Sequence, residues 1–219
     1  MDVRRWRKSK KISMWHLEYK PNLMKKAPFN LILLGDPASG KATQAAMLVK
    51  KYRFFDFDMG KEVTKPSVRT RYDYVKTTAI GHLTPTAIVR DIFKRVVRAV
   101  PPGEGILFDG TPKMIGEARL VTKLLEQHKR SDPLVIYLSI PTNEILRRAK
   151  KRRASMGKKL VRHDDTEEAL RNRKRYYKDQ LSRVVAFFKT KYAFKKISGL
   201  GSRAEVGVRI IAAIHDYML

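Results

Sequence analysis

The sequence predicts an α/β fold in which helices cover both faces of a parallel sheet. Short apolar runs alternate with longer helical patterns along the chain, and glycine or proline occurs at many of the changes. The length of 219 residues suits one domain with a small insertion.

Five apolar runs are predicted to be strands, in the order 31–34, 54–57, 105–108, 134–140 and 192–197. Helical periodicity predicts the longer helices 41–51, 85–100, 116–129, 142–153, 165–191 and 204–218. Pro85 is placed in the first turn of its helix, where the missing N–H is not needed. Residues 61–80 are highly charged and are expected to be helical in short pieces.

A phosphate-binding loop is predicted between the first strand and the first helix. Gly35 is followed, after four residues, by Gly40 and Lys41. This spacing directs backbone N–H groups at phosphate oxygens, and the helix N-terminus adds partial positive charge. In the general pattern a hydroxyl residue follows the lysine directly, but here Ala42 intervenes and Thr43 supplies the hydroxyl. A chance glycine turn is the alternative, and the order of strand, loop, lysine and helix argues against it.

The composition restricts the classes of site and partner. Lys and Arg total 48 against 21 acids, so the net charge is +27, which exceeds what one nucleotide pocket requires and attracts nucleic acid or anionic surfaces. The absence of cysteine excludes disulfides and thiolate zinc sites. No apolar run approaches the ~20 residues that cross a bilayer, so no membrane partner is expected.

Residues 1–28 are expected to be a basic N-terminal extension, and residues 29–219 the folded domain. The basic residues crowd into one end of the extension, with Trp6 and Trp15 nearby: Arg4, Arg5, Arg7, Lys8, Lys10 and Lys11. Three interpretations stay open, namely a solvated tail, a nucleic-acid-binding arm and an organelle-targeting segment.

From residue 29 onward, the motifs resemble those of adenylate kinases. The loop has the family's form at Gly35, Pro37, Gly40, Lys41, Thr43 and Gln44, although Ala38 and Ala42 stand where glycines are usual. Four further segments resemble motifs of the family in order and spacing. They are residues 81–85, residues 109–113, Arg148-x-x-x-Arg152-Arg153, and residues 162–168 with Arg173 downstream. The resemblance implies a P-loop NTPase-like three-layer α/β/α fold with a five-stranded parallel sheet. It also implies a monophosphate-binding insertion near 59–88 and a short lid near 153–163.

The implied enzyme transfers a phosphoryl group from ATP to a nucleoside monophosphate, with AMP as the expected acceptor and two ADP as products. ATP-binding residues implied by the resemblance are Ala38, Ser39, Gly40, Lys41, Ala42, Thr43, Arg148, Arg152 and Gly201. Monophosphate-binding residues are Met59, Gly60, Thr64, His82, Leu83, Thr84, Gly110, Lys113, Glu117, Arg162 and Arg173. The catalytic set is Lys41, Lys113, Arg148, Arg152, Arg162 and Arg173.

Magnesium is the expected metal, held through water near Asp109 and Thr43, and no zinc is expected. Asp164 and Asp165 are expected to orient the arginines. The expected partners are ATP and a nucleoside monophosphate, with nucleic acid possible through the basic arm. A cytoplasmic monomer is expected, with organellar targeting left open.

The acceptor half departs from the family pattern. Met59 and Thr64 replace a threonine and an arginine, Lys113 replaces a phosphate-gripping arginine, and Glu117 replaces an adenine-contacting glutamine. Lys65 is a candidate substitute for the missing arginine. These changes and the +27 charge leave an alternative open, a catalytically weak or inactive relative that docks on RNA or a ribonucleoprotein. Retention of the lysine and the arginines favours the enzyme.

Overall fold

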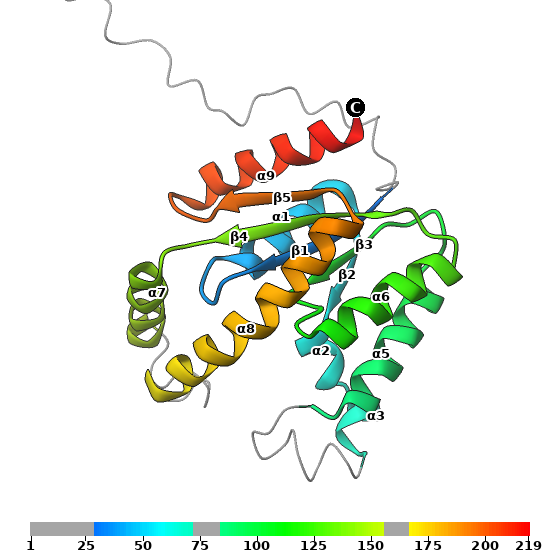
Figure 1. Cartoon of the computed structure of the whole chain (residues 1–219), viewed down its shortest axis with the longest axis horizontal. Coiled ribbons are helices and arrows are strands. Elements are labelled where there is room, and N and C mark those ends of the chain that lie inside the picture. The colour runs from blue at the N-terminus through cyan, green and yellow to red at the C-terminus, as the bar shows by residue number, and fades with distance from the viewer. Residues whose placement is uncertain (1–28, 72–83, 156–166) are drawn as a thin grey trace, which may run out of the picture.

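The sheet of the computed structural model consists of five parallel strands in the order β2-β3-β1-β4-β5 (Figure 1). The structure describes residues 29–71, 84–155 and 167–219. The strands are β1 (Asn30–Gly35), β2 (Phe55–Asp58), β3 (Ile106–Asp109), β4 (Pro133–Ser139) and β5 (Phe194–Ser198). The predicted fold class is therefore confirmed.

The predicted long helices are all present within the described ranges, with ends shifted by a few residues. They are α1 (Lys41–Tyr52), α5 (Thr86–Ala99), α6 (Ile115–Gln127), α7 (Thr142–Ser155), α8 (Glu167–Lys191) and α9 (Arg203–Met218). Two short helices follow β2, namely α2 (Met59–Val63) and α3 (Pro66–Arg69). Pro85 is not in the first turn of its helix: its extended ψ of 138° makes it the residue before α5.

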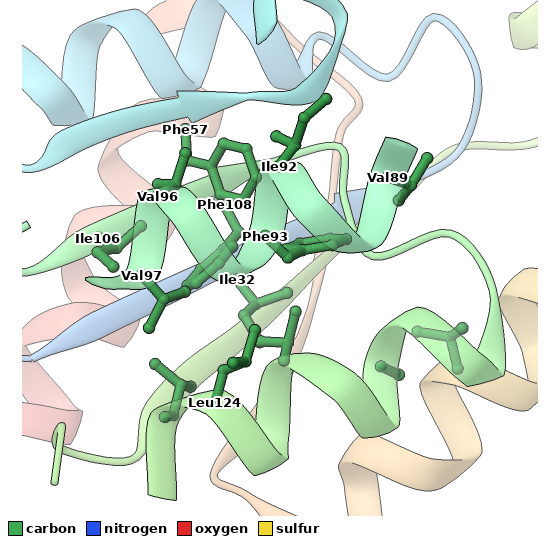
Figure 2. Close-up of a cluster of buried hydrophobic side chains, with 14 of the residues drawn as sticks. Ile32, Phe57, Val89, Ile92, Phe93, Val96, Val97, Ile106, Phe108 and Leu124 are labelled. Atoms are coloured by element: carbon green, nitrogen blue, oxygen red, sulfur yellow. The ribbon is translucent and has the colours of Figure 1, made fainter. Parts of the chain in front are cut away.

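Helices cover both faces of the sheet because side chains alternate along each strand. Ile32 and Leu34 of β1 pack in one core with α5, α6 and α8, whereas Leu31 and Leu33 pack in a second core with α1 and α9. In the first core, shown in Figure 2, the Phe57 ring meets the Phe93 and Phe108 rings edge to face. Each such pair contributes about 0.5–1.5 kcal/mol beyond its buried area.

The carboxyl ends of the parallel strands meet at one edge of the sheet. Asp58 of β2 and Asp109 of β3 are partners in register there, so two carboxylates lie side by side. Gly35 ends β1 at the same edge, and a Cβ on it would lie 2.5 Å from the Leu138 carbonyl oxygen of β4. Glycine therefore lets β1 and β4 approach closely where the phosphate-binding loop begins.

Candidate active site

The loop between β1 and α1 is fastened to β4 through Asp36. The Asp36 carboxylate accepts hydrogen bonds from the Tyr137 hydroxyl at 2.6 Å and from the Ile140 backbone N–H at 2.9 Å. Its own N–H donates to the Leu138 carbonyl at 2.9 Å. Sequence reasoning missed this role of Asp36. These contacts hold the start of the loop against β4 and the residue that follows it.

The loop enters α1 through left-handed backbone. Gly40 precedes the helix with φ 94°, and no side chain in the described part of the chain caps this helix N-terminus. The first backbone N–H groups of α1 are therefore suited to an anionic ligand. Ala38 also adopts a left-handed φ of 58°. A non-glycine residue in this conformation is disfavoured by about 1–2 kcal/mol.

Two further loop residues have different environments. Ser39 is buried, at 2 % exposure, and its hydroxyl has no hydrogen-bond partner among the described residues. Thr43 lies exposed in the first turn of α1.

Lys41 lies against the backbone of the loop that it follows. Its ammonium group donates to the Gly35 carbonyl at 2.6 Å and to the Asp36 carbonyl at 2.9 Å. Burial lowers the pKa of Lys41 to about 8; Asp109 and Asp36 oppose the shift, and Lys113 adds to it. The ammonium group is therefore desolvated but still mostly protonated at neutral pH, and the low local dielectric strengthens its attraction to a phosphate.

Asp109 lies at the strand-end edge among several charges. Burial raises its pKa to about 6, the neighbouring Asp58 raises it further, and Lys41 opposes the shift. Gly110 follows with φ 62°, and a Cβ on it would lie 3.7 Å from Lys41 Cε. The turn after β3 is therefore packed against the lysine of the loop.

Arg148 is held across the phosphate-binding loop by three contacts. Its Nε donates to Glu144 Oε1 at 2.6 Å, Nη1 to the Ala38 carbonyl at 3.4 Å and Nη2 to the Gly199 carbonyl at 2.9 Å. The guanidinium group thus links α7, the loop and the turn after β5. A Cβ on Gly199 would lie 3.2 Å from the Ser39 carbonyl oxygen, which confirms the close approach of that turn to the loop.

Glu144 is a second site residue that sequence reasoning missed. It accepts from Arg148 and also from Arg147 Nε and Nη2, both at 2.7 Å, and these hydrogen bonds lower the pKa of Glu144 to about 2. A signal was present in the sequence, because Glu144 precedes Arg148 by one helical turn. The residues expected to orient the arginines, Asp164 and Asp165, lie outside the described residues.

Acceptor-side residues on α2 are bonded mainly to one another. The Asp58 carboxylate caps this helix by accepting from the Gly60 N–H at 2.8 Å, and Thr64 Oγ1 donates back to the Lys61 carbonyl at 2.9 Å. Met59 is partly buried against the first core. Lys65 donates to the buried Glu62 at 2.6 Å, so part of its charge is already compensated. Its substitution for the missing arginine stays a prediction.

Lys113 lies in the turn after β3, and Glu117 lies in the first turn of α6. The Thr111–Pro112 peptide bond is cis. Glu117 Oε2 accepts from the Lys113 N–H at 2.7 Å, and burial raises the pKa of Glu117 while hydrogen bonds from the Lys113 and Met114 backbone oppose the shift. Lys113 is exposed, and its charge acts on Lys41. The structure thus brings Lys113 to the same end of the sheet as the loop.

The remaining predicted residues are only partly placed. Thr84 immediately precedes Pro85 and is partly buried, and Gly201 has φ 98° in the turn between β5 and α9. Arg152 and Arg173 lie on α7 and α8, but their side chains lie outside the described part, as do His82, Leu83 and Arg162. The extension 1–28, most of the lid near 153–163 and residues 72–83 of the insertion also lie outside it.

The described ranges contain neither a metal-ligating cluster nor a membrane-spanning helix. No group of three or more His, Cys, Asp or Glu residues there could hold a metal ion. None of the helices in those ranges is long and apolar enough to span a membrane.

Comparison with known proteins agrees with this arrangement. The family model described as adenylate kinase matches residues 33–193. An adenylate kinase of Porphyromonas gingivalis is 28% identical over 192 residues, covering 86% of this chain and 96% of that protein. An adenylate kinase of Bacteroides thetaiotaomicron is 29% identical over 189 residues, covering 84% and 97%. The chain therefore belongs to the adenylate kinase family and is a nucleoside-monophosphate kinase.

Proposed function

We propose that the chain transfers the γ-phosphoryl group of ATP to AMP and that Lys41 is the central cation of the transfer. The observation that carries the proposal is the position of the Lys41 ammonium group, which is bonded to the loop carbonyls and lies under the influence of both Asp109 and Lys113. Phosphoryl transfer needs positioning and charge neutralisation more than covalent chemistry. A desolvated lysine at the start of α1, bonded to the loop carbonyls, meets both needs.

On the donor side, the loop 36–40 and the start of α1 would hold the phosphates of ATP through backbone N–H groups. Arg148 would lie over them, because its guanidinium group already bridges the Ala38 and Gly199 carbonyls. Gly201 is proposed to border the same nucleotide. Arg152, Arg162 and Arg173 are proposed to complete the positive charge around the transferred group.

On the acceptor side, Lys113 is proposed to hold the phosphate of AMP. Lys113 lies in the turn after β3. Glu117, in the first turn of α6, fixes this turn by accepting a hydrogen bond from the Lys113 N–H. The remaining acceptor residues are proposed to be Met59, Gly60, Thr64, His82, Leu83, Thr84 and Gly110. Because Lys113 lacks the fork of a guanidinium group, it would bind the phosphate as a point charge.

The residues at the strand ends fit magnesium. Asp109 and Thr43 offer oxygen atoms, and burial together with the neighbouring Asp58 raises the pKa of Asp109, so a cation beside its carboxylate would be favourable. These two residues would hold the ion through water. When bound, the ion would neutralise charge on the phosphates.

The proposal is tested with a coupled ADP-release assay containing Mg-ATP and one of AMP, CMP, UMP, GMP or no acceptor. We expect turnover with AMP to exceed both the other monophosphates and the reaction without acceptor. Preference for another monophosphate would correct the substrate. Rates equal to the reaction without acceptor would instead favour a catalytically weak relative.

A further inference from the structure

Helix α5 carries a line of positive charge on its outer face. Arg90, Lys94 and Arg98 are exposed and follow one another at intervals of four residues, so they lie along one stripe of the helix. The opposite face is buried in the first core through Ile88, Val89, Ile92, Phe93, Val96 and Val97. The apolar face explains why α5 folds onto the sheet, but it does not explain the α5 stripe.

The α5 stripe lacks compensating carboxylates. Within the described ranges, no ion pair involves Arg90, Lys94 or Arg98, whereas some cations on other helices and strands do have partners. Examples are Lys191 with Glu126 at 3.0 Å, Arg183 with Asp179 at 3.5 Å and Lys195 with Asp216 at 3.6 Å. Like charges four residues apart destabilise a helix by about 0.2–0.5 kcal/mol per pair. The stripe therefore works slightly against the stability of α5.

A shallow hollow of about 450 Å³ opens at the C-terminal end of the stripe, lined by Lys94, Arg95, Arg98 and Ala99. Arg95 donates to the buried Glu62 at 2.9 Å, yet its side chain remains 47% exposed. The end of the stripe is therefore concave as well as cationic.

We propose that the α5 stripe binds the phosphodiester backbone of a nucleic acid. A helical rise of 1.5 Å per residue places neighbouring cations about 6 Å apart and the outer two about 12 Å apart. With about 3.4 Å of axis per phosphate of one strand, the stripe covers three to four phosphates. No aromatic side chain is exposed on α5, so binding rests on phosphates and is independent of base sequence.

A lipid surface fits the α5 stripe less well. Interfacial helices insert large apolar side chains beside their cations. Among the described residues, the exposed large hydrophobic ones are Leu146, Leu200, Val208, Met218 and Leu219, and α5 contributes none of them.

The α5 stripe extends away from the active site. α5 ends at Ala99, and the chain then reaches the start of β3, whose Ile106 N–H donates to the Asn30 side chain at 3.0 Å. The C-terminal end of α5 therefore lies at the edge of the sheet opposite the start of α1, where Lys41 is found, and Figure 1 agrees with this placement of the two helices. A nucleic acid bound there would leave the phosphate-binding loop accessible.

The test uses the full chain, a fluorescein-labelled single-stranded RNA of 20 nucleotides, and anisotropy titrations between 50 and 200 mM KCl. One variant combines Arg90→Gln, Lys94→Gln and Arg98→Gln. The matched control combines Lys50→Gln, Lys51→Gln and Arg53→Gln, which removes three clustered charges near the end of α1 on the other face of the sheet. Both variants should retain the kinase activity of the parent, which also checks folding.

We expect the α5 variant to flatten the slope of log K against log salt by about 2, because each lost contact to single-stranded RNA removes about 0.7. The α1 control should keep the parental slope. Equal losses of slope in the two variants would show that the RNA responds to the overall positive charge of the protein and not to the α5 stripe. An unchanged slope in the α5 variant would show that the stripe does not contact the RNA. If the α5 variant lost binding to phosphatidylserine vesicles but kept its RNA binding, the ligand of the stripe would be a lipid surface and not a nucleic acid. Each of these three outcomes overturns the proposal.

Discussion

The donor and acceptor halves of the site are built differently. On the donor side, buried and backbone groups fix the loop: Asp36 binds Tyr137 and Ile140, and Gln44 of α1 donates to the Arg203 carbonyl at 2.9 Å. On the acceptor side, exposed residues of α2 bond mainly to one another. A phosphate cradle thus depends on backbone placement, whereas recognition of the acceptor depends on individual side chains that substitution can redirect.

The largest effect is expected from Lys41→Ala. Removing the ammonium group should lower kcat by about 100-fold or more, which corresponds to about 3 kcal/mol of transition-state stabilisation. Steady-state kinetics measure the change, and Lys123→Ala on the exposed face of α6 serves as the control. A purified, folded Lys41→Ala protein with near-parental kcat would show that the donor half does not depend on this lysine.

A second effect concerns pH, because the pKa of Lys41 is lowered to about 8. The protonated form binds phosphate, and at pH 9 only about one molecule in ten is protonated before ATP binds. ATP binding should therefore be about tenfold weaker at pH 9 than at pH 7. Lys41→Arg should remove this dependence, since guanidinium stays protonated throughout this range. Equilibrium titrations that give a flat pH profile for the parent would contradict the assignment.

On the acceptor side, restoring the family residues should strengthen AMP binding. Met59→Thr combined with Thr64→Arg adds a hydroxyl and a guanidinium group, and one charge-assisted hydrogen bond contributes about 1.5–3 kcal/mol. We expect the KM for AMP to fall about tenfold while the KM for ATP stays constant. If the KM for AMP does not fall, Lys65 or another cation already holds the acceptor phosphate.

Glu144→Gln tests whether the position of Arg148 matters on the donor side. The variant can still accept a hydrogen bond from Arg148 but loses the charge that strengthens it. We expect the KM for ATP to rise about fivefold, with the KM for AMP unchanged. The control is Glu126→Gln, an exposed carboxylate on α6 that pairs with Lys191. Equal increases in both KM values would indicate a general structural role.

The order of strands and helices and the phosphate-binding loop were predictable from the sequence because they are recorded in local patterns. Periodicity reveals β1 and α1, and glycine spacing reveals the loop between them. The contacts of Asp36 were not predictable, since they join residues about a hundred positions apart in the chain. The pairing of Glu62 with Arg95 left no signal either, because the two residues are 33 positions apart and a buried glutamate has the same local sequence as an exposed one.

The smallest expected effect separates the two alanines that replace usual glycines. Ala38 has a left-handed φ of 58°, whereas Ala42 lies in the helical first turn of α1. In Ala38→Gly, relief of about 1–2 kcal/mol of backbone strain should outweigh the extra entropy of the unfolded glycine, about 0.5–1 kcal/mol. Ala42→Gly carries the same entropic cost on folding but relieves no backbone strain. Urea unfolding at constant m should therefore show a gain of about 0.5 kcal/mol for the first variant and a loss of similar size for the second. A loss of unfolding free energy in both variants would show that Ala38 adopts its conformation without strain, and that the donor half gains no stability from glycine at this position.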